Sequence, residues 1–206
     1  MNGLYLVTDR IITQQAGHTV AFVVEEACRA GVRWVQLREK ELSTRAFLEA
    51  ARELKQITQA YGARLIINDR VDIALAVDAD GVHVGQDDMP YEVVRSLVGP
   101  DKLIGLSVNN MIELRAALDD KPDYLGVAAV FATSTKLDTS NLLGLDGLRE
   151  ICTNTSLPRF AIGGINATNI GQIMQAGATG AAVVSAICGQ PSPFEATREL
   201  LQLISE

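Results

Sequence analysis

WVQLREK (34–40), LIIND (65–69) and GVHVG (81–85) are the three β-strand-like runs that decide the fold of this chain. Such runs are apolar on both faces, as expected of parallel strands buried between an inner core and an outer layer of helices. Five more runs of this kind lie outward from them: LYLVTD (4–9), LIGLSV (103–108), YLGVAAV (124–130), FAIGG (160–164) and AAVVSA (181–186). Eight strand-like runs separated by helix-length stretches predict an α/β fold, a closed (β/α)₈ TIM barrel.

The stretches between these runs are amphipathic. In residues 44–61 the apolar side chains recur at helical spacing on one stripe: Phe47, Leu48, Ala51, Leu54 and Ile57. The chain has 206 residues, fewer than the roughly 250 typical of such barrels, so short loops and no second domain are expected. We therefore predict a single domain over residues 1–206.

Composition excludes several classes of partner. The formal net charge is −7, whereas nucleic acids and anionic membranes are bound by basic surfaces. No apolar stretch is long enough to span a bilayer and no signal-peptide pattern opens the chain, so we expect a soluble cytoplasmic protein. Cys28, Cys152 and Cys188 lack the spacing of a disulfide framework or a zinc site. The expected partners are small molecules, and the sequence leaves open whether the chain forms a homo-oligomer.

The end of the second strand carries a cluster of polar side chains. Alternation along a strand sends Gln36, Arg38 and Lys40 to one side and Leu37 and Glu39 to the other. In a barrel the first side is the interior, where an unpaired guanidinium is costly unless an anion meets it. The cluster indicates an anion site; the alternative is a structural ion pair of Arg38 with Glu39 or Asp69.

Carboxylates follow the third and fourth strands. Asp69 ends LIIND, and Asp88 ends the GQDD that follows HV. Carboxylates at neighbouring strand ends suit Mg²⁺, which takes one or two protein carboxylates and completes its shell with water and phosphate oxygens. The alternative is that both aspartates are helix N-caps.

Two later loops indicate further ligand contacts. Thr133, Ser134, Thr135 and Lys136 form a hydroxyl-rich loop closed by a lysine, which suits a heterocycle and a phosphate, or else is a solvent-facing turn. Backbone amides after strands seven and eight form the common phosphate site of these barrels, and Gly164 would let the backbone approach an anion closely. The pattern therefore predicts two phosphorylated ligands in one barrel mouth.

The ordered motifs resemble those of thiamine-phosphate synthases over almost the whole chain. They are LYLVTD, VQLREK, LIINDRVDIA, DGVHVGQDD, IGLSV, DYLGVAAVFATSTK, AIGGI and GATGAAVVSAI. The resemblance implies a transferase that joins an aminopyrimidine-methyl diphosphate to a thiazole phosphate, releasing diphosphate and forming thiamine monophosphate.

Roles for individual residues follow from this resemblance. It implies that Gln36, Arg38, Lys40 and Lys136 hold the diphosphate, and that Asn68 and Ser107 lie near the pyrimidine. Asp69 and Asp88, in preference to Asp87, match the Mg²⁺ ligands. Thr133 and Thr135 match thiazole-side positions, and Gly164, Val184 and Ser185 match the cradle of the second phosphate. Catalytic roles are implied for Arg38, Lys40, Ser107 and Lys136.

Two rival functions remain open on the sequence alone. A thiazole tautomerase-like enzyme would keep the barrel and the monophosphate site but would need a proton-transferring histidine. Asn109 stands where the family often has histidine, and we interpret His83 as a packed core residue. A non-catalytic sensor of thiamine precursors is suggested by Ala128, Ala129 and Ala132, which replace the usual Gly-Pro and Pro of that loop.

Overall fold

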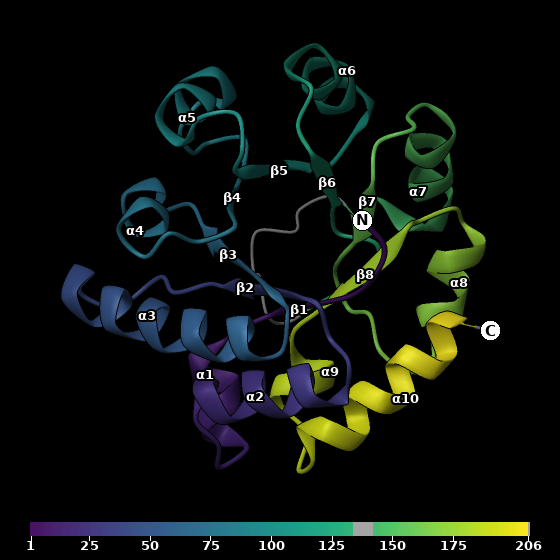
Figure 1. Ribbon diagram of the computed structural model, residues 1–206. Coiled ribbons are helices and arrows are strands. Elements are labelled where there is room, and N and C mark those ends of the chain that lie inside the picture. Colours follow the sequence, from purple (N-terminus) through teal and green to yellow (C-terminus); the bar gives the residue numbers. More distant parts are fainter. Residues whose placement is uncertain (134–141, 206) are drawn as a thin grey trace.

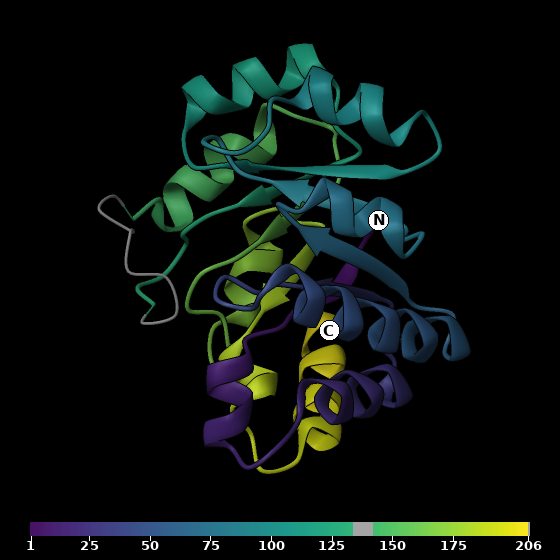
Figure 2. The ribbon, with the colours of Figure 1, turned by 90° about the vertical axis from the view of Figure 1, so that its left-hand side faces the viewer.

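The computed structural model describes residues 1–133 and 142–205. Within these ranges eight parallel strands close into a barrel in sequence order, with β8 paired to β1. Figures 1 and 2 show the helices arranged in a ring around the strands. The strands are β1 (Gly3–Val7), β2 (Trp34–Leu37), β3 (Arg64–Asn68), β4 (Gly81–Val84), β5 (Leu103–Val108), β6 (Tyr124–Val127), β7 (Arg159–Ala161) and β8 (Gly180–Val183). The predicted (β/α)₈ TIM barrel is confirmed.

Helices connect the strands on the outside of the barrel. They are α1 (Arg10–Gln15), α2 (Val20–Ala30), α3 (Thr44–Ala60), α4 (Val71–Ala76), α5 (Tyr91–Val98), α6 (Met111–Asp120), α7 (Gly144–Thr153), α8 (Ile170–Gln175), α9 (Ser185–Cys188) and α10 (Pro193–Ser205). None of the helices in the described ranges combines the length and the hydropathy needed to span a bilayer.

Helix α3 illustrates how the sequence forms these elements. The Ser43 side chain accepts a hydrogen bond from the Ala46 amide and caps the helix N-terminus. Phe47, Ala51 and Leu54 are buried on the stripe expected from their spacing. Burial of this stripe stabilises the helix more than intrinsic propensity does, because isolated helices of this length are marginal in water.

Alternation along the strands separates two cores. Leu4 and Leu6 of β1 pack outward against the helices, in the larger apolar cluster. Tyr5 and Val7 point inward and join a second cluster, whose other buried members are Trp34, Ile66, Tyr124, Phe160 and Ala182. The interior is therefore aromatic at its centre, and it forms the floor beneath the C-terminal ends of the strands.

Some element boundaries differ from the sequence prediction. YLGVAAV was expected to be strand throughout, but β6 ends at Val127. AAVVSA was also expected to be strand, but Ser185 begins α9. In both places apolar residues continue past the end of the strand. These residues are buried or partly buried at the barrel rim, so they are apolar without being part of the sheet.

Candidate active site

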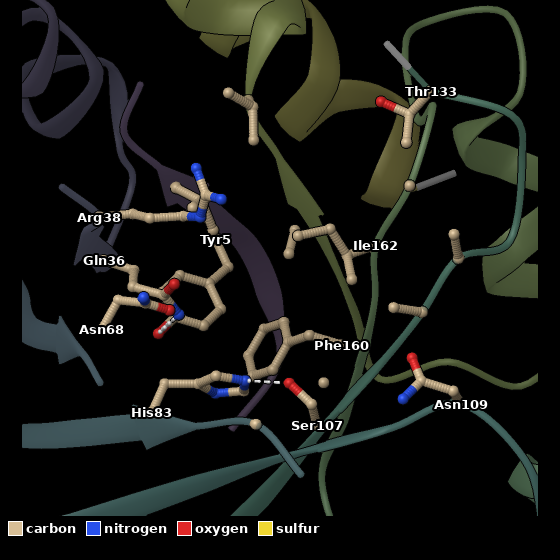
Figure 3. Close-up of a pocket in the computed structure, with 18 of the residues that line it drawn as sticks. Tyr5, Gln36, Arg38, Asn68, His83, Ser107, Asn109, Thr133, Phe160 and Ile162 are labelled. Carbon is tan, nitrogen blue, oxygen red and sulfur yellow. Dashed lines mark hydrogen bonds between the residues drawn. The ribbon is translucent and has the colours of Figure 1, made fainter. Parts of the chain in front are cut away.

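A cavity of about 540 Å³ opens at the C-terminal ends of the strands. Figure 3 shows Gln36, Asn68 and His83 on one wall and Ile162 and Thr133 on the other. Its lining includes every predicted site residue that the structure describes: Gln36, Arg38, Lys40, Asn68, Asp69, Asp88, Ser107, Thr133, Gly164, Val184 and Ser185. Thr135 and Lys136 lie outside the described residues. All the predicted site residues that are described therefore lie around one cavity, and their roles stay predictions.

The second strand places its polar side chains as alternation predicts. Gln36, Arg38 and Lys40 line the cavity. Leu37 is fully buried in the outer core, and Glu39 faces away, where its carboxylate lies 3.6 Å from Nε of Arg10. Burial raises the pKa of Glu39, and the Arg10 charge opposes this rise. The outward side chains thus pack or pair against the surrounding structure, and the inward ones face the cavity.

The ion pairs in the cavity differ from the structural alternative considered above. Arg38 pairs with neither Glu39 nor Asp69; its Nη1 lies 3.9 Å from Oδ2 of Asp9, at the limit of an ion pair. Lys40 instead forms an ion pair with Asp69. The Arg38 side chain is about a quarter exposed, and Asp9 is its ion-pair partner within the described part of the chain. A partly buried guanidinium with so loose a partner is suited to a stronger anion.

The two aspartates do not cap helices. The N-cap of α4 is Arg70 and that of α5 is Pro90, and neither makes a side-chain cap hydrogen bond. Oδ2 of Asp88 instead accepts a hydrogen bond from the Gly85 amide at 2.7 Å, which closes the turn after β4. Asp69 has a φ of 60°, an uncommon left-handed conformation for a non-glycine residue. The helix-cap alternative is therefore wrong for both residues.

The Asp69 and Asp88 carboxylates lie close enough to influence each other. Burial raises the pKa of Asp69, Lys40 opposes the rise, and Asp88 adds to it. Among the described residues no group of three or more histidine, cysteine, aspartate or glutamate side chains is placed to hold a metal ion. Two crowded carboxylates fit Mg²⁺, because this ion uses few protein ligands and takes phosphate oxygens for the rest. The donor set therefore fits a metal bound together with a phosphorylated ligand.

Ser107 and His83 form part of the cavity floor. Nε2 of His83 lies 3.0 Å from Oγ of Ser107, and this hydrogen bond is drawn in Figure 3. Nδ1 of His83 lies 3.1 Å from the Tyr124 hydroxyl. The His83 residue is only 8% exposed. The interpretation of His83 as a packed, hydrogen-bonded core residue is confirmed, although its ring also reaches the cavity.

The loop after β6 packs tightly on the end of β7. The Phe131 amide donates to the Gly163 carbonyl at 3.1 Å, and the Val130 amide donates to that of Ile162 at 3.0 Å. Gly164 has a φ of 61°, and a Cβ there would meet the Ala132 carbonyl and Cβ of Phe131. Glycine is therefore needed at position 164 both for its conformation and for the close approach of the two loops.

Alanines at positions 128, 129 and 132 accompany this packing. A Cβ on Gly163 would lie 2.8 Å from Cβ of Ala129, so the two strand ends touch at this point. The Leu143 amide donates to the Ala129 carbonyl at 2.9 Å, which anchors the start of α7. Backbone hydrogen bonds thus join residues 129–131 to the end of β7 and to the start of α7.

Asn109, the other departure from the family pattern, is bound to a carboxylate. Glu113 accepts hydrogen bonds from the backbone amide and from Nδ2 of Asn109, each at 2.8 Å. Nδ2 of Asn110 also donates to Glu113, at 2.6 Å. All three residues line the cavity. The position that often holds histidine is therefore occupied by a fixed, neutral amide.

Sequence reasoning missed Tyr5, Phe160 and Glu113 as cavity residues. Tyr5 lay within a run interpreted only as buried strand. A tyrosine at a buried strand position needs a partner for its hydroxyl, and that requirement was the available signal.

Comparison with known proteins agrees with this geometry. A family model described as thiamine monophosphate synthase matches residues 4–187. The chain is 50% identical over 202 residues to a thiamine-phosphate synthase of Chloroflexus aurantiacus, covering 98% of this chain and 92% of the relative. It is 49% identical over 201 residues to one of Vibrio parahaemolyticus, covering 98% and 97%. A solved structure of thiamine phosphate pyrophosphorylase from Pyrococcus furiosus superposes with a TM-score of 0.90 at 38% identity, covering 98% and 95%. The chain belongs to the thiamine-phosphate synthase family.

Proposed function

We propose that this chain joins an aminopyrimidine-methyl diphosphate to a thiazole phosphate in a Mg²⁺-dependent reaction that gives thiamine monophosphate and diphosphate. The observation that carries the proposal is that Arg38, Lys40, Asp69 and Asp88 line the same cavity as Gly164 and Ser185. The first four residues follow β2, β3 and β4, and the last two follow β7 and β8. Cations and metal-binding carboxylates suit a diphosphate. A glycine and the first residue of a helix suit a monophosphate.

The polar residues on and after β2 and β3 lie at different depths in the cavity, which indicates different roles. Gln36 is 5% exposed and its Nε2 donates to the Tyr5 hydroxyl at 3.0 Å, at the aromatic floor. Asn68 is also buried. Arg38 and Lys40 lie nearer the rim and are more exposed. We therefore assign the two buried amides to the pyrimidine ring and the two cations to the diphosphate, which moves Gln36 from the role expected for it.

The cations act on charge that develops during bond cleavage. Breaking the bond between the methylene carbon and the diphosphate leaves positive charge on the pyrimidine and adds negative charge to the leaving group. Arg38 and Lys40 interact more strongly with the departing diphosphate than with the bound substrate, so they lower the barrier. Mg²⁺ held by Asp69 and Asp88 would neutralise further charge on the diphosphate.

The protein needs no nucleophile of its own for this reaction. The thiazole nitrogen attacks the methylene carbon, and the chain's task is to hold the two rings together and exclude water, which would otherwise capture the cation. Apolar side chains of Val7, Ile162 and Ile165 contribute to the cavity wall and serve this exclusion.

The test is a Mg²⁺-dependent assay of the purified protein with both substrates, following thiamine monophosphate by its fluorescence after oxidation. We expect product with equimolar diphosphate, and loss of product on addition of a chelator. Binding of both substrates without product would instead favour a precursor sensor. Product formation that is unaffected by a chelator would overturn the metal assignment alone.

Replacement of Arg38 by lysine tests the diphosphate assignment. The charge is retained, but lysine cannot donate two parallel hydrogen bonds to a phosphate group. We expect KM for the pyrimidine diphosphate to rise about tenfold, equivalent to roughly 1.4 kcal/mol, with KM for the thiazole phosphate nearly unchanged. Arg64→Lys, at the N-terminal end of β3 and so away from the cavity, is the matched control. An equal rise in both KM values would contradict the assignment.

The tautomerase-like alternative is disfavoured by the described histidines. His18 lies outside the cavity lining, with Nε2 3.2 Å from the Gln190 carbonyl. His83 is engaged by Tyr124 and Ser107 at its two ring nitrogens. Proton transfer by histidine would require His83 to leave this hydrogen-bonded position.

A further inference from the structure

A continuous series of hydrogen bonds crosses the interior of the barrel from Gln36 to Ser107. Gln36 Nε2 lies 3.0 Å from the Tyr5 hydroxyl, and this hydroxyl lies 2.9 Å from that of Tyr124. The Tyr124 hydroxyl lies 3.1 Å from Nδ1 of His83, whose Nε2 lies 3.0 Å from Oγ of Ser107. We call these five residues the interior relay. Gln36, Tyr5, His83 and Ser107 line the cavity. Tyr124 is fully buried beneath the cavity floor.

The barrel is shaped around the middle of the interior relay. Gly105 and Gly126 face inward on β5 and β6. A Cβ on Gly105 would overlap the Tyr124 ring and Nδ1 of His83, and one on Gly126 would lie 2.8 Å from Cε1 of His83. Glycine in a strand weakens the strand, so two glycines here indicate that space for the two rings outweighs that cost.

The donors and acceptors of the interior relay have one consistent direction. Gln36 donates to the Tyr5 hydroxyl, so the Tyr5 proton is donated onward to Tyr124. Tyr124 then donates to Nδ1 of His83, because a buried hydroxyl proton needs an acceptor. His83 accepts at Nδ1, so it carries its proton on Nε2 and donates to Ser107. Burial raises the pKa of both Tyr5 and Tyr124, so both hydroxyls keep their protons.

This direction determines what the two ends present to a ligand. Because Nε2 of Gln36 is used by Tyr5, its carbonyl oxygen is the atom left to accept from a ligand amino group. Because Oγ of Ser107 accepts from His83, its own proton is left to donate to a ligand ring nitrogen. An aminopyrimidine offers both a donor and an acceptor of this kind.

We propose that Tyr5, Tyr124 and His83 are positioning residues that fix the donor–acceptor direction of Gln36 and Ser107 and so select an aminopyrimidine over a ring of opposite hydrogen-bonding pattern. The selection of the ring rests on the proposed function. The coupling of the two ends through the barrel does not, and it is measurable without substrate.

The direct test reverses the hydrogen bonding at Gln36 and measures the position of the proton on His83, near the other end of the relay. Gln36→Glu places a carboxylate, which accepts but cannot donate, next to Tyr5. Tyr5 must then donate its proton to the introduced carboxylate. Tyr124 in turn donates to the Tyr5 hydroxyl, and Nδ1 of His83 donates to the Tyr124 hydroxyl. The expected result is a change of the His83 proton from Nε2 to Nδ1, read from the ¹⁵N signals of its ring. The measurement is made at about pH 8.5, well above the ordinary pKa values of glutamate and histidine.

The chain supplies its own reference and controls. It has two histidines, and His18 donates from Nε2 to the Gln190 carbonyl, so its ring signals should not change. Gln59→Glu adds the same charge on the exposed face of α3 and should leave His83 unchanged. In a Tyr5→Phe background, Gln36→Glu should no longer move the His83 proton, because the relay is interrupted.

Kinetic effects separate positioning from general damage. Tyr5→Phe frees the Gln36 amide to rotate, so we expect KM for the pyrimidine diphosphate to rise about tenfold, roughly the effect of one net hydrogen bond, while KM for the thiazole phosphate stays the same. Tyr91→Phe, whose hydroxyl donates to the Lys121 carbonyl on the outside, is the matched control.

Two results would overturn the proposal. One is a His83 proton on Nε2 in folded Gln36→Glu protein with an unchanged His18 signal. The other is an identical change of the His83 proton in the Tyr5→Phe background. If Gln36→Glu does not fold, Tyr124→Phe serves instead: loss of the donor to Nδ1 should lower the preference for the Nε2 proton about fivefold or more, and an unchanged preference contradicts the relay. If the parent protein forms no thiamine monophosphate while its Gln36→Glu variant shows the tautomer change, the proposed function is contradicted and the coupling stands.

Discussion

Replacing Asp88 by asparagine is expected to lower kcat/KM by about 10²–10³-fold while leaving the barrel folded, the scale seen on losing one electrostatic stabiliser of a transition state. Asparagine keeps an oxygen that can accept the 2.7 Å hydrogen bond from the Gly85 amide, so the turn after β4 is retained. The change removes the negative charge and replaces one carboxylate oxygen by an amide nitrogen. The measurement is steady-state turnover over a range of Mg²⁺ concentrations, together with thermal unfolding.

Asp87 is the matched control for this substitution. It is the neighbouring residue, it also lines the cavity, and Asp87→Asn makes the same change in charge. It is exposed, whereas Asp88 is partly buried. We expect the Asp87 variant to stay within about threefold of the parent, as befits an exposed charge screened by solvent. Equal losses at both positions would show that general charge in the cavity, and not a metal ligand at Asp88, is responsible.

Asp88→Asn should not destabilise the protein. Burial and the nearby Asp88 carboxylate raise the pKa of Asp69. A carboxyl whose pKa is higher in the folded state than in the unfolded state costs stability once it is ionised, that is, as pH rises through and above its unfolded pKa. Removing the Asp88 charge relieves part of this cost, so the unfolding temperature at neutral pH should be equal or higher. A loss of activity without a loss of stability is typical of a functional charge.

The polar wall of the cavity could be predicted because it depends on local periodicity. The two-residue period of a strand placed Gln36, Arg38 and Lys40 together without knowledge of their neighbours. Strand order in a (β/α)₈ barrel then brought Asp69 and Asp88 to the same rim. These inferences need only the strand positions and the fold.

Contacts between distant strands could not be predicted in this way. Tyr5 and Tyr124 are 119 residues apart, and their hydroxyls meet only because β1 and β6 face each other across the interior. The pairing of Arg38 with Asp9 instead of Glu39 or Asp69 depends on where Asp9, the N-cap of α1, lies at the rim. Such contacts follow from side-chain volumes and rotamers in three dimensions, about which a single sequence contains little information.

Gly105 shows how the floor of the cavity restricts the sequence, and Gly105→Ala is expected to destabilise the protein by about 3 kcal/mol, at the upper end of the usual cost of overpacking. The added Cβ would overlap the Tyr124 ring. Tyr124 is fully buried and packs edge-on against Phe160, with ring centroids 5.7 Å apart, so it has no space into which to move. Urea unfolding measures the change, with Gly171→Ala on α8 as the control. No heavy atom lies within 4 Å of a Cβ built at Gly171, and alanine in a helix is neutral or up to about 1 kcal/mol stabilising.

A second substitution identifies the cause of that loss. Tyr124→Leu shortens the side chain that the new Cβ would meet, so in the double variant Gly105→Ala/Tyr124→Leu the two costs should not add. We expect the double variant to lose about 1–3 kcal/mol less free energy of unfolding than the two single variants lose together, as found for residues in direct contact. Strict additivity would mean that the alanine acts on the β5 backbone and not on the ring. The double variant would nevertheless interrupt the hydrogen bonds from Tyr5 to His83, so recovery of stability without recovery of activity would assign Tyr124 a role beyond packing.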